Sequence, residues 1–210
     1  MKANLLKKAG ALLLMASFSM CVMAQDGQKK NGIERSYAIT LDVKPSSLIP
    51  KEGDNQSLLG LNGGFSILVR QKMLEFEWNL GLQKSFGSKK NAGASLDYKM
   101  FAFTFDVTLG YNYTVPNTNV RIVPFLGFGF ENLISGSIKQ KMGGISTTFD
   151  MKDRDDMGGE VYGTTLYLEG GVKTYFTKNI FAKLRYAHSV MNYKKDVGYQ
   201  FFGIGAGLEF

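Results

Sequence analysis

Phe202-Gly203-Ile204-Gly205-Ala206-Gly207-Leu208-Glu209-Phe210 closes the chain, and in it apolar residues alternate with small or polar ones. Successive side chains of an extended strand point to opposite faces. One face of this segment carries Phe202, Ile204, Ala206, Leu208 and Phe210, and the other carries three glycines and Glu209. The stretch therefore predicts a β-strand that is apolar on one side and ends on an aromatic residue.

The opposite end of the chain has the pattern of a cleavable export signal. Lysines at positions 2, 7 and 8 precede an apolar run over residues 9–18, and Val22-Met23-Ala24 is a suitable cleavage site. The run is too short to cross a bilayer as a helix. Lipidation of Cys21, the only cysteine, is an alternative, but Met20 stands where such signals want a small residue. We expect a signal peptide over residues 1–24, a short polar leader over 25–35 and one domain over 36–210.

Charge and hydropathy exclude several classes of protein. The formal net charge of +7 falls to +4 without the signal, which removes three lysines and no acidic residue. So small an excess does not indicate a nucleic-acid partner, although it suits anionic lipid head groups. Beyond the signal, no stretch approaches the roughly 20 apolar residues of a membrane-spanning helix, which excludes a helical membrane protein. The mean hydropathy near zero fits strands with one lipid-facing side and one polar side.

Period-two alternation predicts eight strands, over residues 37–44, 60–69, 74–83, 101–113, 121–130, 166–176, 180–187 and 202–210. Their connections are alternately long and polar (45–56, 87–94, 133–160 and 191–198) and tight (70–73, 114–119 and 177–179). An even-stranded outer-membrane barrel requires this alternation, with long loops outside, and short turns and both termini in the periplasm. The sequence thus predicts an all-β fold, an eight-stranded antiparallel up-and-down transmembrane β-barrel. Pro124 weakens the fifth strand, because proline removes one ladder hydrogen bond.

Alternation alone does not say which face is outside, since a soluble lipocalin-type barrel would turn its apolar face inward. Glycines gather on the polar face, where a narrow interior needs small residues. Aromatic residues gather at the periplasmic strand ends of the apolar face, as in an interfacial girdle. These residues are Tyr37, Tyr111, Tyr113, Phe176 and Phe210. We therefore expect the apolar face to contact lipid.

The closing strand resembles that of bacterial outer-membrane barrels, in which the barrel-assembly machinery reads a terminal Phe preceded by apolar residues at every second position. The assembly signal implied by this resemblance is Phe202, Ile204, Ala206, Leu208 and Phe210. In architecture the chain resembles the small-barrel family typified by outer-membrane protein X and the membrane domain of outer-membrane protein A. The resemblance implies a monomer in the outer membrane of a Gram-negative bacterium, in contact with outer-membrane lipids and lipopolysaccharide. It also implies a non-enzymatic protein without a cofactor, in structural, adhesive or surface-defence roles.

With the apolar face outside, charges of nearly balanced sign point into the barrel. They are Asp42, Glu75, Glu77, Asp106, Arg121, Glu169, Lys173, Lys183, Arg185 and Glu209, and Lys44 shares their face. Buried charges are tolerable only when they are paired and hydrogen-bonded. Eight strands leave barely enough room for their own side chains. We expect an interlocked polar network that plugs the barrel; a narrow channel for small solutes is the alternative, which a conductance measurement would reveal.

His188 is the one residue with a serious catalytic alternative. The segment Arg185-Tyr186-Ala187-His188-Ser189 resembles in part a motif of outer-membrane lipid A deacylases, barrels with a His and a Ser two residues apart on the lipid-facing surface. Here Ser189 is adjacent to His188 and position 190 is Val, so in a regular strand the two side chains point to opposite faces. We interpret His188 as a rim residue and assign no catalytic residue; a lipid A-modifying enzyme is the second alternative.

The acidic run over residues 150–158 invites a calcium site. Asp153, Asp155 and Gly158 match the first, third and sixth positions of a calcium loop. Met157 and Thr164 occupy the fifth and twelfth positions, where an oxygen ligand and a Glu are needed. We therefore expect a solvated loop and no metal.

The long connection over residues 133–160 is the remaining functional candidate. Residues 137–140 and 146–150 could extend the strands as an exposed hairpin. Loops presented by a rigid scaffold carry function disproportionately. The sequence thus predicts an extracellular binding or adhesion element without identifying its partner. The lysine pairs at 89–90 and 194–195 could contact lipopolysaccharide phosphates, although ordinary solvated loop charge is the simpler interpretation.

Overall fold

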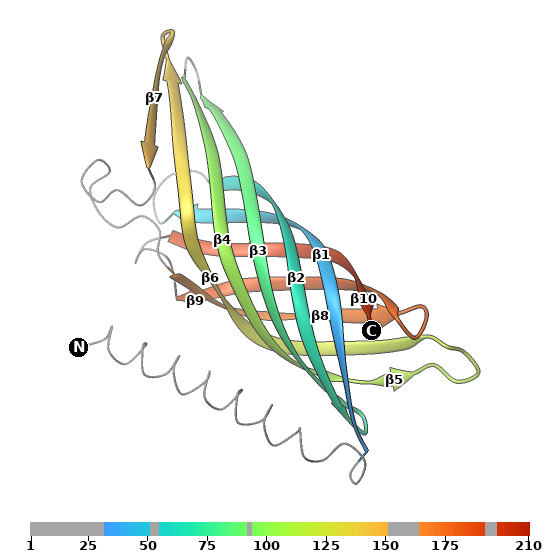
Figure 1. Ribbon diagram of the computed structural model, residues 1–210. Helices are drawn as coiled ribbons and strands as arrows, with labels where there is room; N and C mark the ends of the chain where they lie inside the picture. Colours follow the sequence, from blue (N-terminus) through green and yellow to red (C-terminus); the bar gives the residue numbers. More distant parts are fainter. Residues whose placement is uncertain (1–31, 51–54, 92–93, 151–163, 192–196) are drawn as a thin grey trace, which may run out of the picture.

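Eight long antiparallel strands form a closed ring in the computed structural model, which describes residues 32–50, 55–91, 94–150, 164–191 and 197–210 (Figure 1). The long strands are β1 (Ile33–Pro50), β2 (Gln56–Gln71), β3 (Leu74–Asn91), β4 (Ala94–Tyr111), β6 (Arg121–Met142), β8 (Thr164–Tyr175), β9 (Ile180–Met191) and β10 (Val197–Glu209). Two short strands accompany them, β5 (Tyr113–Thr114) and β7 (Ile145–Asp150), and both pair with β6. The predicted eight-stranded up-and-down fold is confirmed.

Two pairings join the half of the ring formed by β1 to β4 to the half formed by β6, β8, β9 and β10. β1 pairs with β10 at one seam, where Ala38 lies opposite Glu209, and β4 pairs with β6 across the connection that contains β5. Backbone hydrogen bonds between Tyr37 and Phe210 extend the first seam to the last residue, with N···O distances of 3.0 and 2.8 Å. The three tight turns and both ends of the described barrel lie at one end, which we call the turn end; the opposite end is the loop end.

The apolar face of each strand points outward. In β1, Ile39 and Leu41 are 57% and 65% exposed, whereas Thr40 and Asp42, which alternate with them, are buried. All five aromatic residues of the predicted girdle are exposed on this outer surface. A barrel in water would reverse this arrangement, so the outer surface is built for lipid. Within the described residues, no helix is long and apolar enough to cross a membrane.

The strands extend further at the loop end than the sequence predicted. The expected loops over 45–56 and 87–94 are largely strand, because β1 reaches Pro50, β3 reaches Asn91 and β4 starts at Ala94. The reason is a change in which face is apolar. Around Lys99, which is exposed, the inward neighbours Tyr98 and Met100 are buried. Beyond the lipid the outer face meets water, so the apolar residues turn inward and the pattern expected of a lipid-facing strand disappears.

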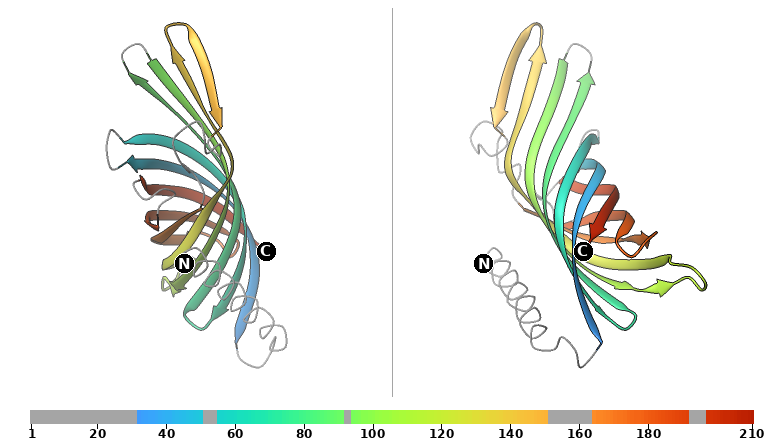
Figure 2. Two further views of the ribbon diagram at one scale, coloured as in Figure 1. Left: turned by 90° about the vertical axis from the view of Figure 1, so that its left-hand side faces the viewer. Right: turned by 45° about the vertical axis from the view of Figure 1, so that its right-hand side comes forward.

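Four strand segments project beyond the rest of the barrel at the loop end. We call residues 87–91, 94–100, 136–142 and 145–150, from β3, β4, β6 and β7, the projecting sheet. Their tips stand well beyond the ends of the other strands in Figure 1 and in both views of Figure 2. The predicted hairpin is confirmed here, since Ser137 pairs with Asp150 and Gln140 with Thr147.

Candidate functional site

Arg185 lies at the centre of the barrel interior and binds three carboxylates from three other strands. Its guanidinium donates to Asp42 of β1 at 2.6 Å, to Asp106 of β4 at 3.2 Å and to Glu169 of β8 at 3.1 Å. All four side chains are buried. Tyr167 adds a hydrogen bond from its hydroxyl to Asp106. A planar guanidinium with five donors can serve several carboxylates at once, which an ammonium group does less well.

A second group of charges fills the interior nearer the turn end. The Lys173 ammonium lies 2.6 Å from Glu75 and 2.7 Å from Glu77, and Lys183 lies 3.6 Å from Glu77. These four side chains are also buried. The alternation of acidic and basic groups leaves each carboxylate facing a cation, as the cost of burying charge requires.

The turn end of this group is closed by Glu209. Arg70 donates to both carboxylate oxygens of Glu209, at 2.5 and 2.6 Å, and to Glu75 at 2.6 Å. Arg121 lies 3.7 Å from Glu209 and stacks over the ring of Tyr175. The bidentate contact of Arg70 ties β2 to β10, the two strands that flank β1.

The structure places all ten charged residues of the predicted network on the inner face. Nine are buried, and only Arg121 is partly exposed, with 22% of its side chain accessible. The sequence prediction omitted Arg70 because it assigned residues 70–73 to a turn, although Arg70 continues the inward positions of Ser66 and Leu68. With Arg70 included, each of the eight long strands contributes a charged side chain to the interior.

Aromatic and small residues fill the space around the charges. Tyr175 packs against Phe181 near the turn end, with ring centroids 5.0 Å apart, and Tyr167 packs edge-on against Phe201 nearer the loop end. Inward glycines make this possible, because a Cβ added to Gly207 would overlap the ring of Phe181. The loop end is lined by a buried apolar cluster that includes Leu48, Leu58, Tyr98, Met100, Leu133, Ile138 and Tyr199. Side chains therefore occupy the lumen from one end to the other.

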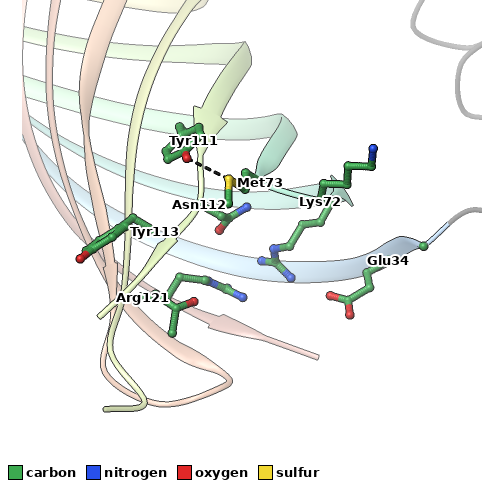
Figure 3. A pocket seen from close by; sticks show the side chains of 10 residues that line it. Glu34, Lys72, Met73, Tyr111, Asn112, Tyr113 and Arg121 are labelled. Carbon is green, nitrogen blue, oxygen red and sulfur yellow. Dashed lines mark hydrogen bonds between the residues drawn. The ribbon is translucent and has the colours of Figure 1, made fainter. Parts of the chain in front are cut away.

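A pocket of about 550 Å³ opens at the turn end (Figure 3). Its lining combines Glu34, Lys72, Asn112 and Arg121 with tyrosines of β4 and β5. Arg70, held by Glu75 and Glu209, also lines it. The mixed charges indicate a solvated mouth above the interior network.

His188 and Ser189 lie on opposite faces of β9. His188 is exposed on the outer surface, whereas Ser189 is buried inside and accepts a hydrogen bond from the backbone N–H of Tyr199 at 2.8 Å. The two side chains therefore cannot work as a nucleophile and its base. The acidic run at 151–158 and the lysines at 194–195 lie outside the described residues. Among the residues that are described, no group of His, Cys, Asp or Glu could hold a metal ion.

A lipid-facing exterior, a charged and filled interior, and strands closed into a ring define a transmembrane barrel of the bacterial outer membrane. The family model of the outer membrane protein beta-barrel domain matches residues 10–210, and the chain belongs to this family. The turn end accordingly faces the periplasm and the loop end faces outward. A search of curated protein sequences found no significant match.

Solved structures of small barrels share the fold. The attachment invasion locus protein Ail of Yersinia pestis, in complex with the heparin analogue sucrose octasulfate, is 16% identical, with a TM-score of 0.50 over 84% of this chain and 99% of Ail. Neisserial surface protein A is 17% identical, with a TM-score of 0.48 over 84% of this chain and 99% of that one. The outer membrane enzyme PagL is 10% identical, with a TM-score of 0.44 over 81% of this chain and 98% of PagL. At these identities the likeness concerns the fold alone.

Proposed function

We propose that the barrel is a sealed, non-enzymatic anchor that presents the projecting sheet to a partner outside the cell. The observation that carries this proposal is the β6–β7 hairpin. β7 pairs with β6 on one side, and within the described residues no strand pairs with its other side. Such an edge offers backbone donors and acceptors to an added strand.

The composition of the hairpin supports the same role. Met142 and Ile145, which flank its turn, are 61% and 74% exposed. Residues 145–149 contain none of the lysines or prolines with which soluble proteins commonly protect an edge strand. A surface of this kind, held far from the membrane by a rigid base, suits an adhesive or surface-defence protein.

The filled interior supports the role of an anchor. Lys183 of β9 lies 3.6 Å from Glu77 of β3, and Arg70 of β2 donates a hydrogen bond to Tyr175 of β8. These contacts connect strands on opposite sides of the lumen, so the base of the projecting sheet is held rigidly. The same filling supports a plugged barrel rather than a narrow channel. The outward His188 with an inward Ser189 argues against the acyl-transfer chemistry of a lipid A-modifying enzyme.

Export and assembly complete the proposal. The signal peptide over residues 1–24 would direct the chain across the inner membrane. The assembly signal lies on the lipid-facing side, where the barrel-assembly machinery would meet it; its residues are Phe202, Ile204, Ala206 and Leu208 of β10 and the terminal Phe210. The product would be a monomer among outer-membrane lipids and lipopolysaccharide.

Shortening the hairpin tests the binding role. Ile138 pairs with Phe149, so replacing residues 139–148 with Asn-Gly joins these two positions by a two-residue turn. The matched control is Gly143→Asn, because Gly143 and Gly144 have φ of 57° and 85° and an Asn-Gly pair fits such a turn. Both variants should keep the slower gel migration on heating that marks a folded barrel.

Adhesion of cells that display each variant is then measured on bare surfaces and on surfaces coated with serum proteins or with heparin. We expect the wild type and Gly143→Asn to exceed cells without the protein on at least one coating, and the shortened variant to fall to the level of those cells. Equal adhesion of the shortened variant, or no adhesion by the wild type, would contradict the proposal.

A further inference from the structure

A pocket of about 470 Å³ lies on the barrel surface where β3, β4 and β6 leave the lipid-facing belt. Lys84, Lys99, Phe101, Ser135 and Ser137 are among the residues that line it. Lys84 and Lys99 are exposed on the outer face, and neither has a carboxylate within ion-pair distance in the part of the chain that the structure describes. Two cations without acidic partners thus meet an aromatic ring and two hydroxyl-bearing residues.

The position of this pocket relative to the membrane follows from the length of the strands. The outward residues of β4 are apolar from Tyr111 to Phe101, ten residues apart. At about 3.3 Å per residue and a tilt of about 40°, ten residues cover about 25 Å along the membrane normal, which is the height of an outer-membrane apolar belt. Lys84 lies ten residues from Leu74 in β3, at the matching level. Both ammonium groups therefore reach the head groups of the outer leaflet.

The charge of the surrounding surface favours an anion. Above the pocket, Lys90, Lys139 and Lys141 occupy the same outer face of the projecting sheet, together with the carboxylates of Asp97 and Asp150. Asp97 lies 3.4 Å from Lys141. A hydrogen bond from Ser88, with a further contribution from Lys141, holds the pKa of Asp97 below its ordinary value. Asp97 thus interacts with Ser88 and Lys141 rather than with Lys84 or Lys99.

We infer that this pocket binds the phosphorylated head group of an outer-leaflet glycolipid, with Lys84 and Lys99 contacting its phosphate and Phe101 contacting the start of its acyl chains. A phosphate offers several strong acceptor oxygens to ammonium and hydroxyl donors. The apolar surface below the pocket, which includes Leu82 and Phe103, continues into the hydrocarbon region. The combination of phosphate donors above and apolar surface below distinguishes a lipid from a free anion. This inference is independent of the hairpin proposed to bind an extracellular partner.

Binding of defined lipids to the purified full-length barrel tests the inference. Native mass spectrometry from detergent micelles would compare bisphosphorylated lipid A with the same lipid after removal of both phosphates. The double variant Lys84→Gln/Lys99→Gln is compared with Lys72→Gln/Lys178→Gln, which removes the same charge from two turns at the periplasmic end. Lys84→Arg/Lys99→Arg serves as the charge-preserving variant.

We expect Lys84→Gln/Lys99→Gln to weaken the binding of bisphosphorylated lipid A about a hundredfold, which is about tenfold for each charge-assisted hydrogen bond that is lost. The periplasmic control and the arginine variant should bind nearly as the wild type, and the dephosphorylated lipid should bind weakly to all four proteins. Unchanged binding in the Gln double variant, an equal loss in the periplasmic control, or full binding of dephosphorylated lipid would overturn the inference. Displacement of the lipid by inorganic phosphate would also overturn it in favour of a free-anion site.

Discussion

Arg185→Met removes the guanidinium that three carboxylates share across the lumen, while it keeps a long unbranched side chain in the same space. Asp106 keeps its hydrogen bond from Tyr167, but Asp42 and Glu169 lose their contacts with Arg185, at 2.6 and 3.1 Å. Removing one partner of a buried ion pair costs about 3–5 kcal/mol, because the remaining charge stays buried without compensation. That range corresponds to about two to four orders of magnitude in the equilibrium constant of unfolding.

Reversible urea unfolding of the barrel in lipid vesicles measures this loss. The only tryptophan, Trp78, lies on the outer face of β3 and reports on transfer from lipid to water. Arg185→Lys should lie between wild type and Arg185→Met, since an ammonium group keeps the charge but not the planar fork. Lys178→Met, in an exposed turn, should change the free energy of unfolding by no more than about 0.5 kcal/mol. A loss below about 1 kcal/mol for Arg185→Met would refute the view that the central cluster depends on this guanidinium.

Three further predictions follow from the packing and the surface. Gly207→Val should lower the free energy of unfolding by at least about 2 kcal/mol, since its side chain would overlap the ring of Phe181. Gly63→Ala should leave the midpoint of urea unfolding nearly unchanged, because a Cβ added there meets no atom within 4 Å. Phe210→Ala should reduce the amount of folded protein in the outer membrane of living cells more than Phe176→Ala does, although both side chains belong to the girdle and are similarly exposed. Equal amounts of the two folded variants on heat-shift gels would contradict a special role of the terminal position. The purified wild-type barrel should show no large, stable conductance in planar bilayers, because side chains fill its lumen; steady channels would contradict the sealed interior.

The alternation of apolar and polar residues in the membrane-spanning part could be predicted from the sequence, because each face of a strand keeps the same surroundings there. With lipid outside and a polar interior, a strand such as β3 keeps its apolar residues on the same outer face from Leu74 to Leu82. The loop end could not be read in the same way. Outside the lipid, Tyr98 and Met100 turn inward while Lys99 faces water, so the apolar positions change face within one continuous strand. A pattern search that assumes one apolar face ends the strand at that point.

The sequence also predicted which charged residues point inward, but it did not predict which of them form ion pairs. Period two places Asp42, Arg185 and Glu169 inside without saying that they meet, because that depends on the relative height of β1, β8 and β9 across the lumen. Strand register, fixed by backbone pairing and turn geometry, sets that height. The omission of Arg70 has a simpler cause: a charged residue beside a tight turn suits solvent as well as it suits the interior.

A β-bulge in β6 lies where the membrane-spanning part of the barrel meets the projecting sheet. Ala102 pairs with Leu133 and Phe101 with Ser135, so Ile134 is an extra residue at the level where β6 leaves the lipid. One extra residue turns every later side chain of a strand to the opposite face. Without it, Ile138 would face outward, whereas in the structure it is buried in the inner apolar cluster. The lysines at 139 and 141 would face inward instead of lying on the outer face with Lys99. The bulge therefore lets β6 turn its apolar residues toward lipid within the membrane and toward the interior beyond it. The same extra residue places Ile138 in the apolar cluster at the loop end and the lysines on the outer face of the projecting sheet.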